Sequence, residues 1–322
     1  MQAEKALARR YAVLLSCVHR TAYALAHPRF AHVAAAYEGI QRHPSLFTPN
    51  SVRDWLHPTF VAWLDNGGGD AGKIAREEAS EIYSFPLLST SLCEMLRAEI
   101  DHFHASGLEA RRPNSMNNYG LILNDIGLRQ SLSALQMLVA PLARSLFPTE
   151  GASLDDHHSF VVSYREGEDL GLDMHTDDSD VTLNVCLGDV FDGAGLTFCG
   201  DVGSPQHRFQ SFQYQHQIGR GLLHLGRRRH GADDLRSGHR TNLIMWNYNR
   251  AYREAAQHRS RVYLPEAAAP DPQCVSYTHD RDYAQVRGDY PPGKARHALQ
   301  AWCPPPRAEY PAFRGSSGRY AR

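Results

Sequence analysis

The chain has 322 residues, of which 42% are hydrophobic, and a formal net charge of -1. This length exceeds one average domain but suits a single β-rich core with helical additions, so a sizeable hydrophobic core is expected. The apolar content argues against a wholly disordered chain, and the balanced charge argues against general electrostatic capture of nucleic acid or of an anionic membrane.

Cysteine usage favours a reducing compartment. Six cysteines are scattered without any Cys-x-x-Cys pair, and no Asn-x-Ser/Thr acceptor occurs, so we expect a cytoplasmic or nuclear protein with free thiols. Residues 1–25 are rich in Ala and Arg, but charges interrupt them, so they predict neither a signal peptide nor a membrane span. An organellar transit peptide stays open as an alternative.

The N-terminal part, residues 1–80, shows helical periodicity. One apolar stripe consists of Tyr11, Leu14, Leu15 and Val18, and another of Phe60, Trp63 and Leu64. This spacing predicts a helical region that caps the core. It ends at a glycine-rich break, residues 66–69.

Residues 81–250 predict the main domain, in which helices support a sheet. A strand-like run at 82–88 precedes two expected helices, at 89–103 and 128–146. Short β-rich runs separated by turns then follow, at 160–164, 181–187, 196–199, 212–216, 222–225 and 243–248. Such runs predict an α+β fold with a double-stranded β-helix (jelly-roll) core at 159–250. Residues 251–322 are rich in Pro and Arg and predict a C-terminal extension with a partly disordered tail.

A candidate metal site lies within the predicted core. His175 and Asp177 are separated by one residue, and His230 follows shortly after the apolar run 221–226. On an extended segment, positions i and i+2 point to the same side, so the first two side chains can converge on one metal. Two imidazoles and one carboxylate can bind one face of Fe(II) and leave the other face open. We therefore predict that these three residues bind Fe(II) and carry the catalysis.

A candidate anchor for a co-substrate follows. Arg240 stands ten positions after His230 and opens the apolar run 241–246, which predicts a neighbouring buried strand. Its planar fork of donors suits a carboxylate, so a dicarboxylic 2-oxo acid would fit between the arginine and the metal. Thr182 and Asn184 alternate on one face of their expected strand, where they either line the same cavity or pack along the sheet.

Other histidines compete for the metal. His224 lies inside an apolar run and His239 falls close to the next strand, so both are interpreted as packed or exposed imidazoles. His216, with Arg227 eleven residues later, stays as an alternative ligand. The basic run 227–229 is typical of a solvated face, although its place beside His230 also suits contact with an acidic substrate.

These residues also resemble a known family. The order of His175-x-Asp177, His230 and Arg240, with residues 163–167, 181–187 and 193–198 around it, resembles Fe(II)- and 2-oxoglutarate-dependent dioxygenases of the prolyl and lysyl hydroxylase branch. Residues 113–127 and 277–283 are similar to the 2-oxoglutarate and iron-dependent oxygenase domain-containing protein 2 family. The likeness runs from about Glu81 to Tyr283, and the N-terminal region matches more loosely.

The resemblance implies an enzyme that takes Fe(II), 2-oxoglutarate and dioxygen, and ascorbate is a further expected ligand. It implies that Arg240 pairs with the distal carboxylate of 2-oxoglutarate and that Tyr164 reaches the same molecule through its hydroxyl, a core aromatic being the alternative. Thr182 and Asn184 are expected to line that site. The implied reaction is hydroxylation of a C–H bond of a protein side chain, with release of succinate and CO2.

Two other functions stay open. The chain could be a dioxygenase that acts on a small molecule or a nucleic acid, because likeness of fold does not fix a substrate. It could also be a non-catalytic jelly-roll module that keeps a metal for stability. The presence of Arg240 argues against that module, since a purely structural metal needs no co-substrate anchor.

Overall fold

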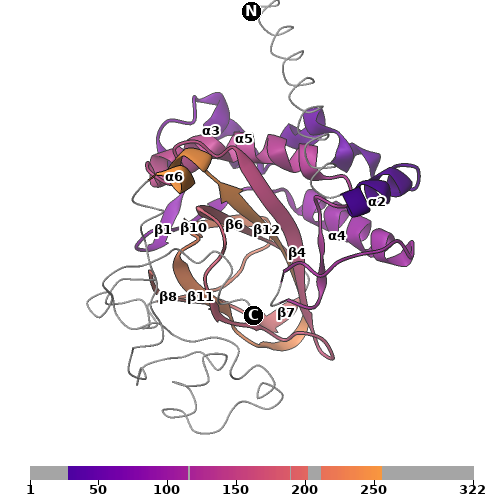
Figure 1. Cartoon of the computed structure of the whole chain (residues 1–322). Helices are drawn as coiled ribbons and strands as arrows, with labels where there is room; N and C mark the ends of the chain where they lie inside the picture. Colours follow the sequence, from indigo (N-terminus) through magenta and orange to yellow (C-terminus); the bar gives the residue numbers. More distant parts are fainter. Residues whose placement is uncertain (1–27, 115–116, 189, 202–211, 256–322) are drawn as a thin grey trace, which may run out of the picture.

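The computed structural model describes residues 28–114, 117–188, 190–201 and 212–255 (Figure 1). The expectations for the first apolar stripe, for the motif at 277–283 and for the disordered tail lie outside these residues. Figure 1 shows helices α2, α4 and α5 on one side of the long strands, with β8 and β11 on the other.

The helices begin where local sequence favours a helix start. The described helices are α2 (Pro28–Glu38), η1 (Pro44–Phe47), η2 (Pro49–Trp55), α3 (Pro58–Asp65), η3 (Ala71–Lys73), α4 (Thr90–Ala105), α5 (Arg129–Leu146) and α6 (Arg250–Glu254). A proline occupies an early position of η1, η2 and α3, where its fixed φ suits the first turn. Ser89 caps α4 because its hydroxyl accepts the Leu92 N–H at 3.3 Å. The helices expected at 89–103 and 128–146 are confirmed.

The strands form two antiparallel sheets. The larger sheet runs in the order β1 (Arg76–Ala79), β2 (Ile82–Pro86), β10 (Arg220–Leu225), β6 (Val181–Gly188), β12 (Leu235–Tyr248), β4 (Asp156–Arg165) and β3 (Gly120–Ile122), and β7 (Phe191–Gly193) pairs with β12. The smaller sheet runs in the order β5 (Leu172–His175), β11 (Arg228–Ala232), β8 (Leu196–Asp201) and β9 (Phe212–Tyr214). From β4 onward the chain passes repeatedly between the two sheets, as expected for the predicted double-sheet roll.

Side chains on the two faces of the larger sheet enter different cores. On β12, Leu243 and Met245 join the helices in one apolar cluster, whereas Ile244 faces a second cluster that includes Phe160 of β4 and Phe198 of β8. This alternation follows from the two-residue period of a strand. A mixed architecture of helices and antiparallel sheet is thus confirmed. That the helices before residue 80 act as a cap stays a prediction.

Two strands differ from the sequence-based expectation. His230 does not follow a strand but lies within β11, whose residues carry little apolar character although all five are buried. Arg240 does not open a strand but lies inside β12, which begins at Leu235. Pairing with β8 and β5 holds β11 as a strand, so tertiary contacts override its weak local pattern. Within the described residues, no helix is long and apolar enough to span a bilayer.

Candidate functional site

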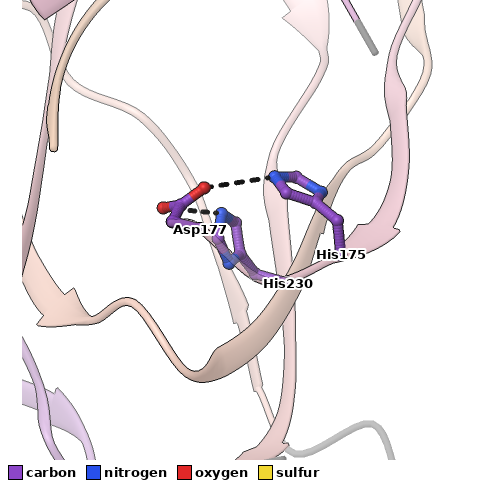
Figure 2. Close-up of side chains that lie close together, drawn as sticks. All are labelled: His175, Asp177 and His230. Carbon is purple, nitrogen blue, oxygen red and sulfur yellow. Dashed lines mark ion pairs between the residues drawn. The ribbon is translucent and has the colours of Figure 1, made fainter. Parts of the chain in front are cut away.

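The fold brings His175, Asp177 and His230 together, as Figure 2 shows. His175 ends β5 and stands directly opposite His230 of β11 in the strand register, with ring centroids 4.4 Å apart. Asp177 lies two residues beyond β5, and its backbone N–H donates to the Gly226 carbonyl at 2.9 Å. Asp177 therefore does not lie on the strand expected from sequence, and this backbone hydrogen bond helps to fix its position instead.

The three side chains present their polar atoms to one another. The Asp177 carboxylate lies 3.5 Å from His175 Nε2 through one oxygen and 3.6 Å from His230 Nε2 through the other. All three potential ligand atoms fall within 4.8 Å of each other. No other group of three His, Cys, Asp or Glu side chains in the described ranges could hold a metal in this way.

The protonation states suit metal binding. Burial lowers the pKa of His230 to about 3, so its imidazole is neutral at pH 7. Burial alone would raise the pKa of Asp177, but His230, in its protonated form at low pH, and a hydrogen bond from His175 bring it below its usual range. His230 Nδ1 lies 2.9 Å from the Arg228 carbonyl, which can only accept, so Nδ1 carries the proton. The Nε2 lone pair is then left to face Asp177.

Two hydroxyls hold the carboxylate from behind. Thr182 Oγ1 donates to Asp177 Oδ2 at 2.6 Å, and Ser179 Oγ lies 2.6 Å from Thr182 Oγ1. Because the single Thr182 proton goes to the carboxylate, Ser179 must donate to Thr182. Thr182 and Asp177 are 1% and 4% exposed, so this chain of hydrogen bonds is shielded from water.

Arg240 is a buried cation in the same region. It is 1% exposed and stands opposite Tyr164 in the pairing of β12 with β4, with its guanidinium carbon 4.5 Å from the centre of the Tyr164 ring. One Nη donates to the carbonyl of Ala194, a residue with a positive φ of 49°. Nε has no partner among the described residues, and none of their carboxylates lies within 4.0 Å. Burial lowers the pKa of Arg240, but a guanidinium still remains protonated at pH 7.

One cavity contains both the three-residue metal cluster and Arg240. It is lined by all seven residues singled out from sequence, namely Tyr164, His175, Asp177, Thr182, Asn184, His230 and Arg240. Asn114, Asn117, Asn242 and Trp246 also line it and were missed. A two-residue period counted from Arg240 along β12 would have found Asn242 and Trp246. The asparagines before β3 carry no periodic signal.

The other histidines considered as metal ligands do not belong to the three-residue cluster. His224 is fully buried and packs against Phe198, and His239 lies 2.8 Å from the Ser163 hydroxyl. His216 lies outside the three-residue cluster, with a ring nitrogen 3.4 Å from Asn242 Nδ2.

The prediction that the basic run 227–229 forms a solvated face was wrong. Arg228 and Arg229 are 9% and 2% exposed, and Arg227 pairs with Glu150. The reason is β11, an inner strand of the smaller sheet, which draws this run into the protein.

The chain is similar to one family model and to several named proteins. Residues 33–152 match the model of an OGFOD2-like domain, so the family likeness begins earlier than Glu81. The chain is 40% identical over 172 residues to the human 2-oxoglutarate and iron-dependent oxygenase domain-containing protein 2, covering 52% of this chain and 49% of that protein. For the mouse protein of the same name, identity is 38% over 230 residues, covering 68% and 65%.

A more distant relative is the human multifunctional procollagen lysine hydroxylase and glycosyltransferase LH3, which is 29% identical over 229 residues, covering 66% of this chain and 29% of that protein. A crystal structure of a Pseudomonas putida prolyl-4-hydroxylase is similar with a TM-score of 0.37 and 16% identity, covering 61% and 97%. The chain spans about half the length of the first curated relatives it matches.

Proposed function

Because this chain carries an OGFOD2-like domain over residues 33–152, we propose that it is an Fe(II)- and 2-oxoglutarate-dependent dioxygenase. One observation carries the proposal. A cluster of two imidazoles and one carboxylate shares a buried cavity with Arg240, a cation that has no carboxylate partner among the described residues. A site built only to hold a metal would not need that second feature.

The donor set fits Fe(II). His175, His230 and Asp177 would supply two nitrogens and one oxygen on one side of the ion, which leaves room for a chelating co-substrate and for dioxygen. The Arg228 carbonyl fixes the His230 tautomer, and Thr182 fixes one carboxylate oxygen, so these ligands are oriented before metal arrives.

The remaining lining residues fit 2-oxoglutarate. Arg240 would take its distal carboxylate, and Tyr164 would donate to the same group. Thr182 and Asn184 would line the space between, with Asn184 Oδ1 held by Asn242 Nδ2 at 2.6 Å. With Fe(II) and 2-oxoglutarate bound, the site would use dioxygen: one oxygen atom would convert a substrate C–H bond to C–OH, and the other would enter the succinate that forms from 2-oxoglutarate with loss of CO2.

For the substrate we propose a protein side chain. The support is the similarity of this chain to the human multifunctional procollagen lysine hydroxylase and glycosyltransferase LH3. Small molecules and nucleic acids are the alternative substrate classes, and the experiment below includes both. Ascorbate stays a prediction, as do a cytoplasmic or nuclear location and the division into 1–80, 81–250 and 251–322.

The ligand assignment is tested first with metal alone. Mn(II) binding, measured by calorimetry, should be lost in His230→Ala and kept in His216→Ala. The second variant is a matched control, because His216 lies near the cavity but outside the cluster. Loss of binding in His216→Ala with binding retained in His230→Ala would overturn the assignment.

The co-substrate assignment is tested by succinate formation from 2-oxoglutarate with iron and oxygen. Affinity for 2-oxoglutarate should fall from wild type to Arg240→Lys, which keeps the charge but loses the fork, and again to Arg240→Ala. The total loss should be on the order of 2–5 kcal/mol, because the partner carboxylate is left buried. Peptide, nucleotide and metabolite pools added in parallel report the substrate class. Iron-loaded protein that neither binds 2-oxoglutarate nor forms succinate would favour the non-catalytic module.

A further inference from the structure

Two asparagines just before β3 contribute to the candidate active site. Asn114 and Asn117 line the same cavity as the metal cluster and Arg240. Asn117 is 1% exposed, and its Nδ2 donates to the Tyr164 hydroxyl at 3.1 Å. Tyr164 itself is 2% exposed and lies under the Arg240 guanidinium.

The orientation of both amides follows from one backbone group. The Asn117 backbone N–H can only donate, and it meets Asn114 Oδ1 at 2.8 Å. The other end of the Asn114 amide is therefore the NH2 group, which donates to Asn117 Oδ1 at 3.0 Å. Asn117 must then present its own NH2 group to Tyr164. The Asn117 backbone N–H thus fixes which end of each side-chain amide carries the nitrogen.

These hydrogen bonds limit where the Tyr164 phenol proton can point. Because Tyr164 accepts a hydrogen bond from Asn117, its own O–H has to point elsewhere. No acceptor for that proton occurs among the residues that the structure describes, and the nearby Arg240 offers only donors. The unpartnered Nε of Arg240 and the Tyr164 O–H thus leave an excess of donors at this end of the cavity. Such a set suits an anion.

We propose that Asn117 is a positioning residue that sets Tyr164 as a hydrogen-bond donor to the distal carboxylate of a dicarboxylic 2-oxo acid. This inference rests on the proposed function and adds a basis for selectivity. The relay from Asn114 through Asn117 to Tyr164 favours a co-substrate with a distal carboxylate over a 2-oxo acid of the same length without one. A monocarboxylic acid would leave both Arg240 and the phenol proton unsatisfied.

The surrounding backbone keeps this segment close to β4. Gly120 has a φ of 138°, and a Cβ there would lie 2.0 Å from the Val161 carbonyl oxygen. Asn118 donates to Asp169 twice, from its backbone N–H at 2.8 Å and from Nδ2 at 2.9 Å. Asn117 is therefore placed by contacts on its C-terminal side that do not involve Tyr164.

The test uses the full chain loaded with Mn(II), titrated calorimetrically with 2-oxoglutarate and with 2-oxopentanoate. Asn117→Ala should weaken 2-oxoglutarate binding roughly three- to tenfold, as expected for one net hydrogen bond. Asn117→Asp keeps the shape but accepts the phenol proton and adds a negative charge, so the loss should be roughly tenfold or more. Binding of 2-oxopentanoate and of Mn(II) should change less than about twofold in both variants.

A double-mutant cycle separates positioning from a structural role. In a Tyr164→Phe background, Asn117→Ala should cause little further loss of 2-oxoglutarate affinity, because the hydroxyl on which it acts is gone. Asn118→Ala is the matched control, since it removes a neighbouring amide that bonds Asp169 and not Tyr164. Equal losses in the two backgrounds, or equal losses for both 2-oxo acids, would overturn the inference alone. Wild-type protein that binds Mn(II) but not 2-oxoglutarate would overturn the proposed function and the inference together.

Discussion

Replacing Thr182 by valine removes the hydroxyl that holds Asp177 while keeping a branched side chain of similar size. The lost contact is a 2.6 Å hydrogen bond to a carboxylate, between two groups that are 1% and 4% exposed. A hydrogen bond to an ionised group contributes about 1.5–3 kcal/mol, and water cannot replace it here. At about 1.4 kcal/mol per factor of ten, metal affinity should fall roughly 10- to 100-fold.

The assay is calorimetric titration of Mn(II) into wild type and Thr182→Val. Thr197→Val is a matched control, because Thr197 Oγ1 makes a hydrogen bond of the same 2.6 Å length to Asp233, which is not a member of the metal cluster. The control should lose some stability but keep its Mn(II) affinity within about twofold. If Thr182→Val bound Mn(II) as tightly as the control, the idea that Thr182 orients the carboxylate for the metal would be refuted.

Three further predictions concern stability. Burial lowers the pKa of His157 from 6.5 to about 3, so its contribution is present above pH 6.5 and lost as the pH falls toward 3. Unfolding free energy should drop in that window by up to about 1.4 kcal/mol per pH unit, and His157→Gln should flatten the slope. Glu99→Ala should cost about 3 kcal/mol or more in denaturant unfolding, because a fully buried carboxylate accepts the Tyr37 hydroxyl and two backbone N–H groups; a loss below about 1 kcal/mol would contradict this. Gly120→Ala should lower the melting temperature through its clash with β4, whereas Gly69→Ala, with nothing within 4 Å, should not.

Sequence alone predicted the elements whose own pattern is strong. β6 is a mainly apolar and β-branched run broken only by Asn184 before its final glycine, and α4 has a serine cap followed by helical spacing, so both were predicted near their observed bounds. β11 could not be predicted in this way, since the sequence Arg-Arg-His-Gly-Ala reads as polar surface. Its arginines are buried because two neighbouring strands enclose them, which is a tertiary effect.

The residues of the candidate site also differ in whether the sequence predicts them. His175, Asp177, His230 and Arg240 were recognisable because their spacing reflects a chemical requirement, and the fold brings all four to one cavity. Asn117 had no such signal. Its importance depends on a contact with a strand residue 47 positions later and on the direction of an amide. Neither is encoded in a local pattern.

Arg240 is a buried cation whose lost hydration is only partly replaced by its neighbours. Taking a guanidinium out of water is costly unless charge or hydrogen bonds replace the lost solvation. In the described structure Arg240 has one carbonyl, the face of the Tyr164 ring and an unpartnered Nε. Asn117 donates to the Tyr164 oxygen, so the phenol proton is left as one more donor beside the guanidinium. An anionic ligand would satisfy these donors, which is the pattern expected of a binding site rather than of a packed core.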